Sequence, residues 1–144
     1  MRRFFLVTGV LLAMNVTAYS QIGVSSYSIY SLGISTSKEK RIGGELKSFF
    51  NRGDFENTYY ELSGMYNFRS KNYHQFSVGV GLNIAPFIGF DHIQSFTFPI
   101  QLEVFPLQNF KQLSFVIEIA PEWIIEEPLN MRHLWGLKYT FKKN

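Results

Sequence analysis

The chain has 144 residues, enough for one domain, and 17% of them are aromatic, a composition that favours strands over helices. Charged residues also make up 17%, below the roughly 25% of ordinary soluble domains, so part of the surface is expected not to face water. The absence of cysteine excludes a disulfide framework, a cysteine-based zinc site and a lipidated cysteine.

Residues 1–20 have the organisation of a secretory signal peptide. Arg2 and Arg3 form a basic start, residues 4–14 are apolar, and Ala18 and Ser20 are small at the two positions that cleavage needs, so Gln21 is the predicted mature start. The alternative, a membrane anchor helix, is disfavoured because the apolar run is too short. Without this leader the number of basic residues falls from 14 to 12, whereas the number of acidic residues stays at 11. No clustered basic face remains in the domain, residues 21–144, and nucleic-acid binding is therefore not expected.

The mature chain alternates between apolar and small or polar residues, which is the two-residue period of strands. The clearest stretch is residues 75–85, where Phe76, Val78, Val80, Leu82 and Ile84 share one face. Its length suits a tilted strand that crosses a bilayer, which takes about 9–11 residues. The first stretch of the series keeps a good phase only in its second half. The predicted strands are residues 24–35, 41–50, 58–69, 75–85, 95–105, 112–123 and 132–141.

Short turns at residues 36–40, 70–73 and 106–111 alternate with loops at residues 51–57, 86–94 and 124–130. No helical pattern follows the leader, so the sequence predicts an all-β fold, an up-and-down antiparallel transmembrane barrel. Bacterial single-chain barrels have an even number of strands, so about eight are expected although seven are clearly readable. The eighth is expected within residues 22–30, unless the sheet closes differently.

The polar face of these strands is predicted to line the interior of the barrel. It is rich in Gly, Ser, Ala and Asn, whereas a face in water usually carries many long charged residues. Its charges have both signs, as buried charges must in order to pair. The alternative is a soluble lipocalin-like barrel with the opposite sidedness. The predicted interior charges are Arg41, Glu45, Lys47, Glu61, Arg69, Glu103, Glu118, Glu122 and Lys138.

The prolines indicate which end of the barrel is the outer rim. Pro lacks the N–H that a strand ladder needs, so it occurs at strand ends, edges or bulges. Pro86 ends one strand, and folding about the turn near Asn109 brings Pro99 level with Ala120 and Pro121. These residues are expected above the membrane ladder, at the extracellular end that carries the longer loops.

The last predicted strand ends in alternating aromatic and apolar residues, Trp135, Leu137, Tyr139 and Phe141. Together with the leader and the small size, this segment resembles the closing strand of small outer-membrane β-barrels of the OmpX/OmpA-like class, especially those of Bacteroidetes-type bacteria. The resemblance covers the whole mature chain. It implies a Gram-negative outer-membrane location, contact with outer-membrane lipid, and recognition of the closing strand by the barrel-assembly machinery. It carries over no catalytic residue.

The sequence contains no catalytic constellation, and three scattered histidines give no convergent metal site, so no cofactor is expected. We expect a small integral outer-membrane barrel with a structural or surface-interaction role, whose loops bind an extracellular ligand of unknown identity. Eight strands leave an interior that side chains just fill. One alternative is a secreted soluble barrel that binds a small apolar ligand. Another is a lipid-modifying enzyme that uses Asp91 and His92 in a rim loop.

Overall fold

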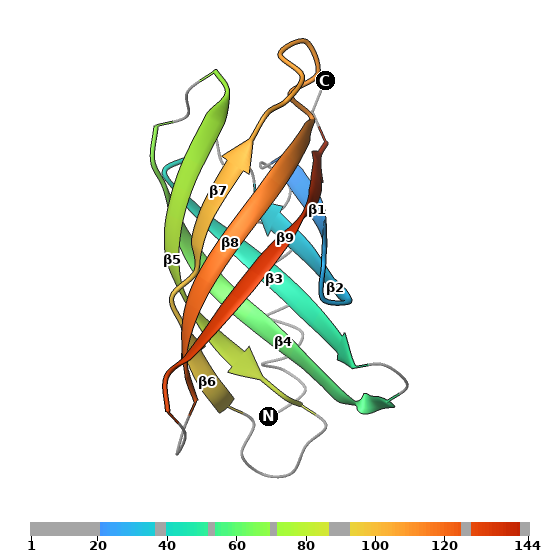
Figure 1. The fold of residues 1–144 in the computed structure, drawn as a ribbon, viewed down its shortest axis with the longest axis vertical. Helices are drawn as coiled ribbons and strands as arrows, with labels where there is room; N and C mark the ends of the chain where they lie inside the picture. Colours follow the sequence, from blue (N-terminus) through green and yellow to red (C-terminus); the bar gives the residue numbers. More distant parts are fainter. Residues whose placement is uncertain are drawn as a thin grey trace, which may run out of the picture.

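The computed structural model describes residues 21–36, 40–51, 54–69, 72–86, 93–124 and 128–141, and these residues form a single antiparallel sheet (Figure 1). The predicted leader lies outside these residues. The described part of the chain forms no helix long and apolar enough to cross a membrane. The strands are β1 (Ile22–Tyr27), β2 (Ser31–Thr36), β3 (Ile42–Asn51), β4 (Asp54–Asn67), β5 (His74–Ile84), β6 (Ile93–Thr97), β7 (Ile100–Val104), β8 (Leu113–Ile124) and β9 (Asn130–Thr140).

The sheet closes into a barrel because its first and last strands pair. Each strand runs antiparallel to the strands beside it in the sheet, and β1 pairs with β9 from Gly23 opposite Thr140 to Tyr27 opposite Gly136. Both β6 and β7 lie between β5 and β8, so they are two parts of one interrupted strand. The barrel therefore has eight strands, and the all-β up-and-down fold with an even strand number is confirmed.

The eighth strand is β1, which confirms the expectation of a strand within residues 22–30, whereas the prediction of a single strand over residues 24–35 is wrong. This stretch is a hairpin, in which Tyr27 on β1 lies opposite Ser31 on β2. The three residues between them include Tyr30, which has a φ of 27°. A three-residue hairpin turn ends in such a left-handed residue, usually a glycine. Tyr30 gives no such signal, so the turn is not visible in the sequence, and the inward positions keep the same phase on both sides of it.

The predicted loop at residues 51–57 is largely strand, because β3 runs to Asn51 and β4 begins at Asp54. The other two predicted loops are shorter than expected at their ends: β6 begins at Ile93, β8 ends at Ile124 and β9 begins at Asn130. Residues 87–92, which include Asp91 and His92, and residues 125–127 lie outside the described residues.

Pro99 interrupts the barrel wall instead of marking its rim. The register places Pro99 level with Ala120, as predicted, but pairing continues beyond it from Ser95 opposite Ile124 to Thr97 opposite Glu122. The N–H of Gly79 donates to the Pro99 carbonyl (2.8 Å), and the N–H of Phe98 donates to the Pro121 carbonyl (3.0 Å). Neither proline has an N–H to donate in return. The expectation that these prolines lie above the ladder is therefore wrong.

The register also fixes the tilt of the strands. If one steps from each residue to its partner on the next strand around the barrel, a path that starts at residue 84 of β5 returns to β5 at residue 74. The stagger of the barrel is therefore ten residues. Eight strands with this stagger give a tilt of about 40° at ordinary strand spacings. Ten residues tilted in this way rise about 25 Å along the barrel axis. The path passes through Ile84, Tyr60, Ser48, Leu32, Ser26, Leu137, Phe115, Val104 and His74.

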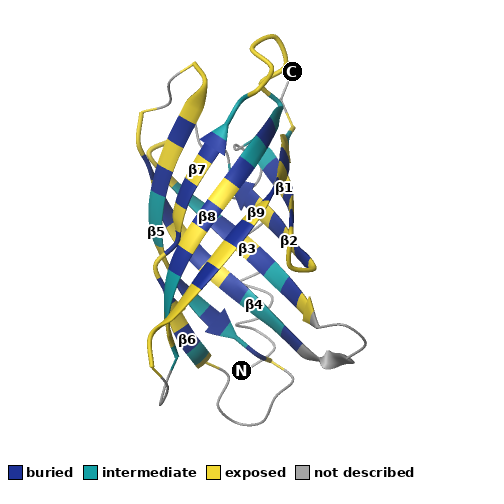
Figure 2. Ribbon diagram, viewed as in Figure 1, coloured by how far each residue is buried: buried dark blue, intermediate teal, exposed yellow. Residues whose placement is uncertain are grey.

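Burial alternates along every strand, with polar residues inside and apolar residues outside (Figure 2). Glu61, Lys47 and Glu118 have no exposed surface, whereas Val80 is 62% exposed. Most outward positions of the described strands carry large apolar side chains. This polarity is the reverse of that in a soluble lipocalin-like barrel, which encloses its apolar face.

Candidate functional site

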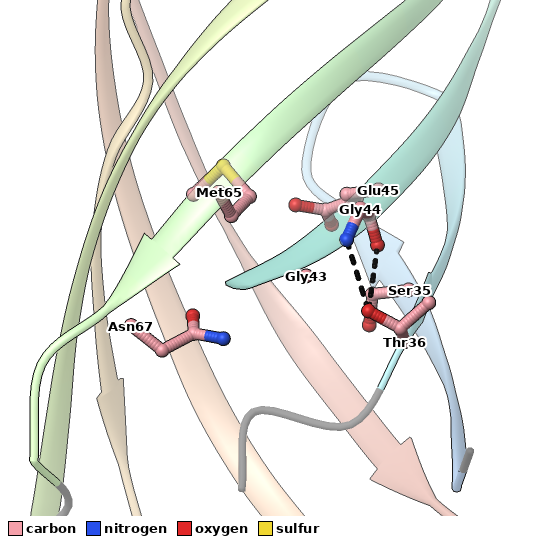
Figure 3. A pocket seen from close by; sticks show the side chains of 7 residues that line it. All are labelled: Ser35, Thr36, Gly43, Gly44, Glu45, Met65 and Asn67. Atoms are coloured by element: carbon pink, nitrogen blue, oxygen red, sulfur yellow. Dashed lines mark hydrogen bonds between the residues drawn. The ribbon is translucent and has the colours of Figure 1, made fainter. Parts of the chain in front are cut away.

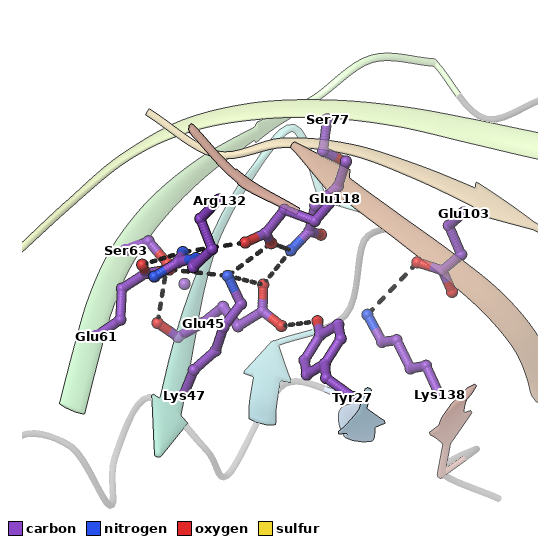
Figure 4. Close-up of polar contacts among 12 residues, drawn as sticks. Tyr27, Glu45, Lys47, Glu61, Ser63, Ser77, Glu103, Glu118, Arg132 and Lys138 are labelled. Atoms are coloured by element: carbon purple, nitrogen blue, oxygen red, sulfur yellow. Dashed lines mark hydrogen bonds and ion pairs between the residues drawn. The ribbon is translucent and has the colours of Figure 1, made fainter. Parts of the chain in front are cut away.

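The centre of the barrel interior holds a ring of four alternating charges (Figure 4). The ammonium of Lys47 on β3 lies 2.8 Å from Glu61 Oε1 on β4 and 2.6 Å from Glu118 Oε2 on β8. Arg132 on β9 bonds the other oxygen of each carboxylate, with its Nη2 atom 3.2 Å from Glu118 Oε1 and also paired with Glu61 Oε2. Each carboxylate thus joins both cations. We call these four residues the charge ring.

A second group of polar side chains extends the charge ring across the interior. The Tyr27 hydroxyl donates to Glu45 Oε1 (2.6 Å). The side-chain amide of Gln101 donates to Glu45 Oε2 (2.5 Å) and to Glu118 Oε2 (2.6 Å). Every carboxylate oxygen of Glu45, Glu61 and Glu118 therefore accepts at least one hydrogen bond, as buried carboxylates require.

Strand register explains part of this arrangement, and closure of the barrel explains the rest. Lys47 lies directly opposite Glu61 on neighbouring strands, and Gln101 lies directly opposite Glu118. Lys47 and Glu118, in contrast, come from β3 and β8, which are separated by β2, β1 and β9 in the sheet. Their 2.6 Å contact therefore crosses the lumen. The charge ring obstructs the interior at this level.

Two smaller polar groups lie on either side of the charge ring along the barrel axis. Toward the C-terminal end of β9, Lys138 pairs with Glu103 at 3.5 Å, and the Ser114 hydroxyl donates to Glu103 (2.6 Å). Toward the opposite end, Glu122 accepts hydrogen bonds from the Ser95 hydroxyl (2.5 Å) and from the Asn83 amide. The interior is thus polar on both sides of its centre.

Apolar side chains fill the space beside the charge ring. Tyr27, Phe49, Val116 and Leu134 form a buried cluster, and Tyr59 packs against it. The rings of Phe49 and Tyr59 stack at 4.6 Å. Arg132 lies over Phe49 with 4.8 Å between its guanidinium carbon and the ring centroid, a distance at which a cation is attracted to the ring.

A small pocket lies where β2 ends and β3 begins (Figure 3), with room for roughly one water molecule. The Thr36 hydroxyl accepts a hydrogen bond from the N–H of Gly44 there (2.9 Å). The Asn67 amide donates to the Lys40 carbonyl (2.8 Å) and accepts from the Ser77 hydroxyl (2.8 Å). The pocket is too small for an organic ligand. Its lining is Ser35, Thr36, Gly43, Gly44, Glu45, Met65 and Asn67.

The structure brings together most of the charges predicted for the interior. Arg41 and Arg69 are the exceptions, because both are exposed. Arg41 precedes β3 and Arg69 follows β4, so neither lies within the wall that encloses the lumen. The residues found inside, buried or nearly so, are Glu45, Lys47, Glu61, Glu103, Glu118, Glu122 and Lys138.

Three residues that bond the buried carboxylates were not among the predicted interior charges: Arg132, Gln101 and Tyr27. Arg132 stands six residues before Lys138 on one strand, so the same two-residue period that places Lys138 inside also places Arg132 there. Gln101 had a comparable signal, because it lies two residues before Glu103 on the same strand and therefore shares its face. Tyr27 is in phase with the inward positions of β2, but the signal was hidden because an aromatic residue points inward there while the polar Ser26 points outward.

The aromatic residues of the closing strand point away from the lumen. Trp135, Leu137, Tyr139 and Phe141 are all exposed on the outer face. Tyr139 and Phe141 contact edge to face, with 5.0 Å between ring centroids.

The described residues contain no group of three or more side chains placed to hold a metal ion. His74 and His133 are both exposed. In the part of the chain that the structure describes, the chemistry of the interior is that of paired charges.

No protein-family model and no curated protein matches this chain. Among solved structures, the chain is similar to the Yersinia pestis outer membrane protein Ail in a phospholipid bilayer nanodisc, at 14% sequence identity and a TM-score of 0.48. The alignment covers 85% of this chain and 98% of the other. A likeness at this level says nothing of activity or ligands.

Proposed function

We propose that this chain is a small integral outer-membrane β-barrel with a structural or surface-interaction role and no catalytic activity. The observation that carries the proposal is the inverted polarity of the closed barrel. Val80 is 62% exposed, whereas Glu61 and Glu118 have no exposed surface. Lipid is the solvent in which an apolar outside and a charged inside are both favourable.

The height of the apolar outer face supports the same proposal. The outward positions from the level of His74 to the level of Ile84 span about 25 Å along the axis, which is the height of the apolar band of outer-membrane barrels. Exposed aromatic residues lie near both margins of this band: Phe68 and Phe141 at one margin, Phe96 and Trp123 at the other. Such girdles are typical of the two membrane interfaces.

The charge ring favours a closed barrel over a diffusion pore. Lys47, Glu118 and Arg132 join strands across the lumen, and separating them would leave buried charges without partners. We therefore assign binding to the surface loops. The OmpX/OmpA-like class is the group that this combination resembles, and the Bacteroidetes-type source stays a prediction from sequence.

The proposal is tested by expressing the full chain in a Gram-negative host and fractionating the cells. We expect the protein in the outer-membrane fraction, extracted by detergent and retained in salt and alkali. We also expect it to migrate differently on a gel before and after boiling, since a closed barrel resists detergent. Release by salt or alkali without detergent would show that the membrane assignment is wrong.

A further inference from the structure

The end of the barrel at which β1 begins and β9 ends carries exposed cations on its three turns. Lys40 and Arg41 precede β3, Arg69 follows β4, and Lys111 lies in the turn before β8. All four side chains are exposed, and among the described residues none of them pairs with a carboxylate. They are therefore open to an anion from outside the chain. We call these four residues the basic collar.

The segments that connect the strands have opposite charge at the two ends of the barrel. In sequence, the three segments at the end with the basic collar contain six basic residues and one acidic residue. The four segments at the other end contain three acidic residues and one basic residue. An anion is therefore attracted to one end only. The first set is residues 37–41, 68–73 and 105–112, and the second set is residues 28–30, 52–53, 85–92 and 125–129.

The basic collar lies directly beyond one aromatic margin of the apolar band. Arg69 follows Phe68, which is exposed on the outer face. Lys111 follows Phe110, whose ring centroid lies 6.3 Å from that of Tyr139 on β9. Aromatic residues of this kind occupy the interface between the hydrocarbon and the headgroups. The cations that come next along the chain therefore lie at the level of the lipid phosphates.

Hydrogen bonds hold the turns of the basic collar against the barrel wall. The Asn67 N–H donates to the Arg41 carbonyl (2.7 Å), and the Asn67 side chain donates to the Lys40 carbonyl (2.8 Å). The Phe105 N–H donates to the Tyr73 carbonyl (2.8 Å), which joins the turn before β8 to the turn before β5. In Figure 1 the turn between β7 and β8 stands beside the end of β9. The cations thus follow the wall from β3 to β8.

We propose that the basic collar binds the phosphate groups of anionic phospholipids in the leaflet at this end of the barrel. This inference rests on the proposed function, because it takes the barrel to span the outer membrane with its longer loops outside. The leaflet concerned is then the inner, periplasmic one. An anionic headgroup is preferred to a zwitterionic one, because the ammonium of a zwitterionic headgroup is repelled by the same cations.

The distribution of the basic collar favours lipid over other sources of anions. Lipid surrounds a barrel on all sides, as the cations do from β3 to β8, whereas an acidic protein docks on one side. A free phosphate has no enclosed pocket here, and exposed charges in water are screened and hold it weakly. A lipid phosphate is already concentrated at this level by the membrane.

The test measures which lipid the inserted barrel selects. The full chain is reconstituted in phosphatidylcholine with a trace of spin-labelled phosphatidylglycerol or spin-labelled phosphatidylcholine. Electron spin resonance separates the immobilised lipid beside the protein from the bulk lipid, and this gives the ratio of the two association constants. The neutral variant combines Lys40→Gln, Arg41→Gln, Arg69→Gln and Lys111→Gln. The matched control combines Arg41→Lys and Arg69→Lys, which keep the charge.

We expect the wild type and the matched control to prefer phosphatidylglycerol by about threefold or more, since each cation near an anionic surface is attracted to it. The ratio should fall close to one in the neutral variant, and it should decrease in high salt. A wild type without preference, or a neutral variant that keeps it, would overturn the inference.

Two further arms distinguish the other sources of anions. Loss of the preference on adding glycerol phosphate at constant ionic strength would assign the basic collar to soluble phosphates. Co-sedimentation with purified peptidoglycan, without any lipid preference, would assign it to the cell wall. Either result would overturn the inference and leave the proposed function intact if the barrel inserts, whereas a chain that fails to insert removes both.

Discussion

Lys47 has no exposed surface, yet carboxylates from opposite walls of the barrel hold its ammonium group. Charges buried in this way are stabilised only while their partners stay in place. Because Glu118 bonds Lys47, Arg132 and Gln101 together, it is the carboxylate on which most of the interior depends.

Replacing Glu118 by Leu should destabilise the barrel by about 3–5 kcal/mol, because Arg132 then keeps Glu61 alone and Lys47 keeps Glu61 and the more distant Glu45 at 3.8 Å. The matched control is Glu122→Gln on the same strand, which is partly exposed and bonds Asn83 and Ser95. Its effect should stay below about 1 kcal/mol. Urea unfolding in detergent, followed by tryptophan fluorescence, measures both. Similar losses for the two variants would contradict a special role for the ring.

Positions that face outward near the middle of the apolar band should not tolerate a charged side chain. Val80→Arg should reduce the folded fraction, because a cation on the lipid face near the midplane costs roughly 2–4 kcal/mol. Asn83→Lys on the same strand is the control, since Asn83 faces inward and bonds Glu122, which a lysine would pair with. The fraction that migrates as folded barrel before boiling measures both variants. Equal losses would argue against the assigned sidedness.

At the scale of strands, the seam between β1 and β9 depends on a close approach of backbones. A Cβ atom at Gly136 would collide with the backbone of Ser26 on β1, whereas at Gly64 nothing lies within 4 Å. The seam therefore requires glycine at position 136, whereas position 64 on β4, away from the seam, has room for a side chain.

Gly136→Ala should lower the yield of closed barrel several-fold, while Gly64→Ala should leave it unchanged. Refolding into detergent, scored by the gel shift on boiling, gives the yield. Normal refolding of Gly136→Ala would show that β1 and β9 approach less closely than described here.

The interruption between β6 and β7 is a second feature at this scale. Pro99 receives a hydrogen bond from Gly79 and returns none. Pro99→Ala supplies the missing N–H, and we expect it to raise the free energy of unfolding by about 1 kcal/mol. The control is Pro106→Ala, which is exposed in a turn. A lower urea midpoint for Pro99→Ala would mean that packing of the buried ring outweighs the hydrogen bond.

For the whole molecule, the charge ring predicts a barrel that does not conduct solutes. Liposomes containing the protein should swell in arabinose no faster than empty liposomes, with a general porin as the positive control. Rapid swelling would show that the ring opens or that the lumen has another path.

The sequence predicted the general architecture and most of the charged interior, because a two-residue period places each side chain inside or outside without knowledge of the neighbours. Glu45, Lys47, Glu61, Glu118 and Lys138 were found in this way. What it missed depended on local geometry. Tyr30 reverses the chain without the usual glycine, and residues 54–57 continue a strand despite a composition typical of turns. Which charges pair across the lumen follows from the closed register, which one strand does not reveal.

The pairing of Gly23 with Thr140 has a kinetic consequence. β1 is the first strand of the barrel and β9 the last, so β1 gains its second neighbour only when nearly the entire polypeptide is in place. Contacts this distant in sequence form slowly. Until the two ends meet, the apolar outer face does not belong to a closed wall, and the unfolded chain is most prone to aggregation during that interval.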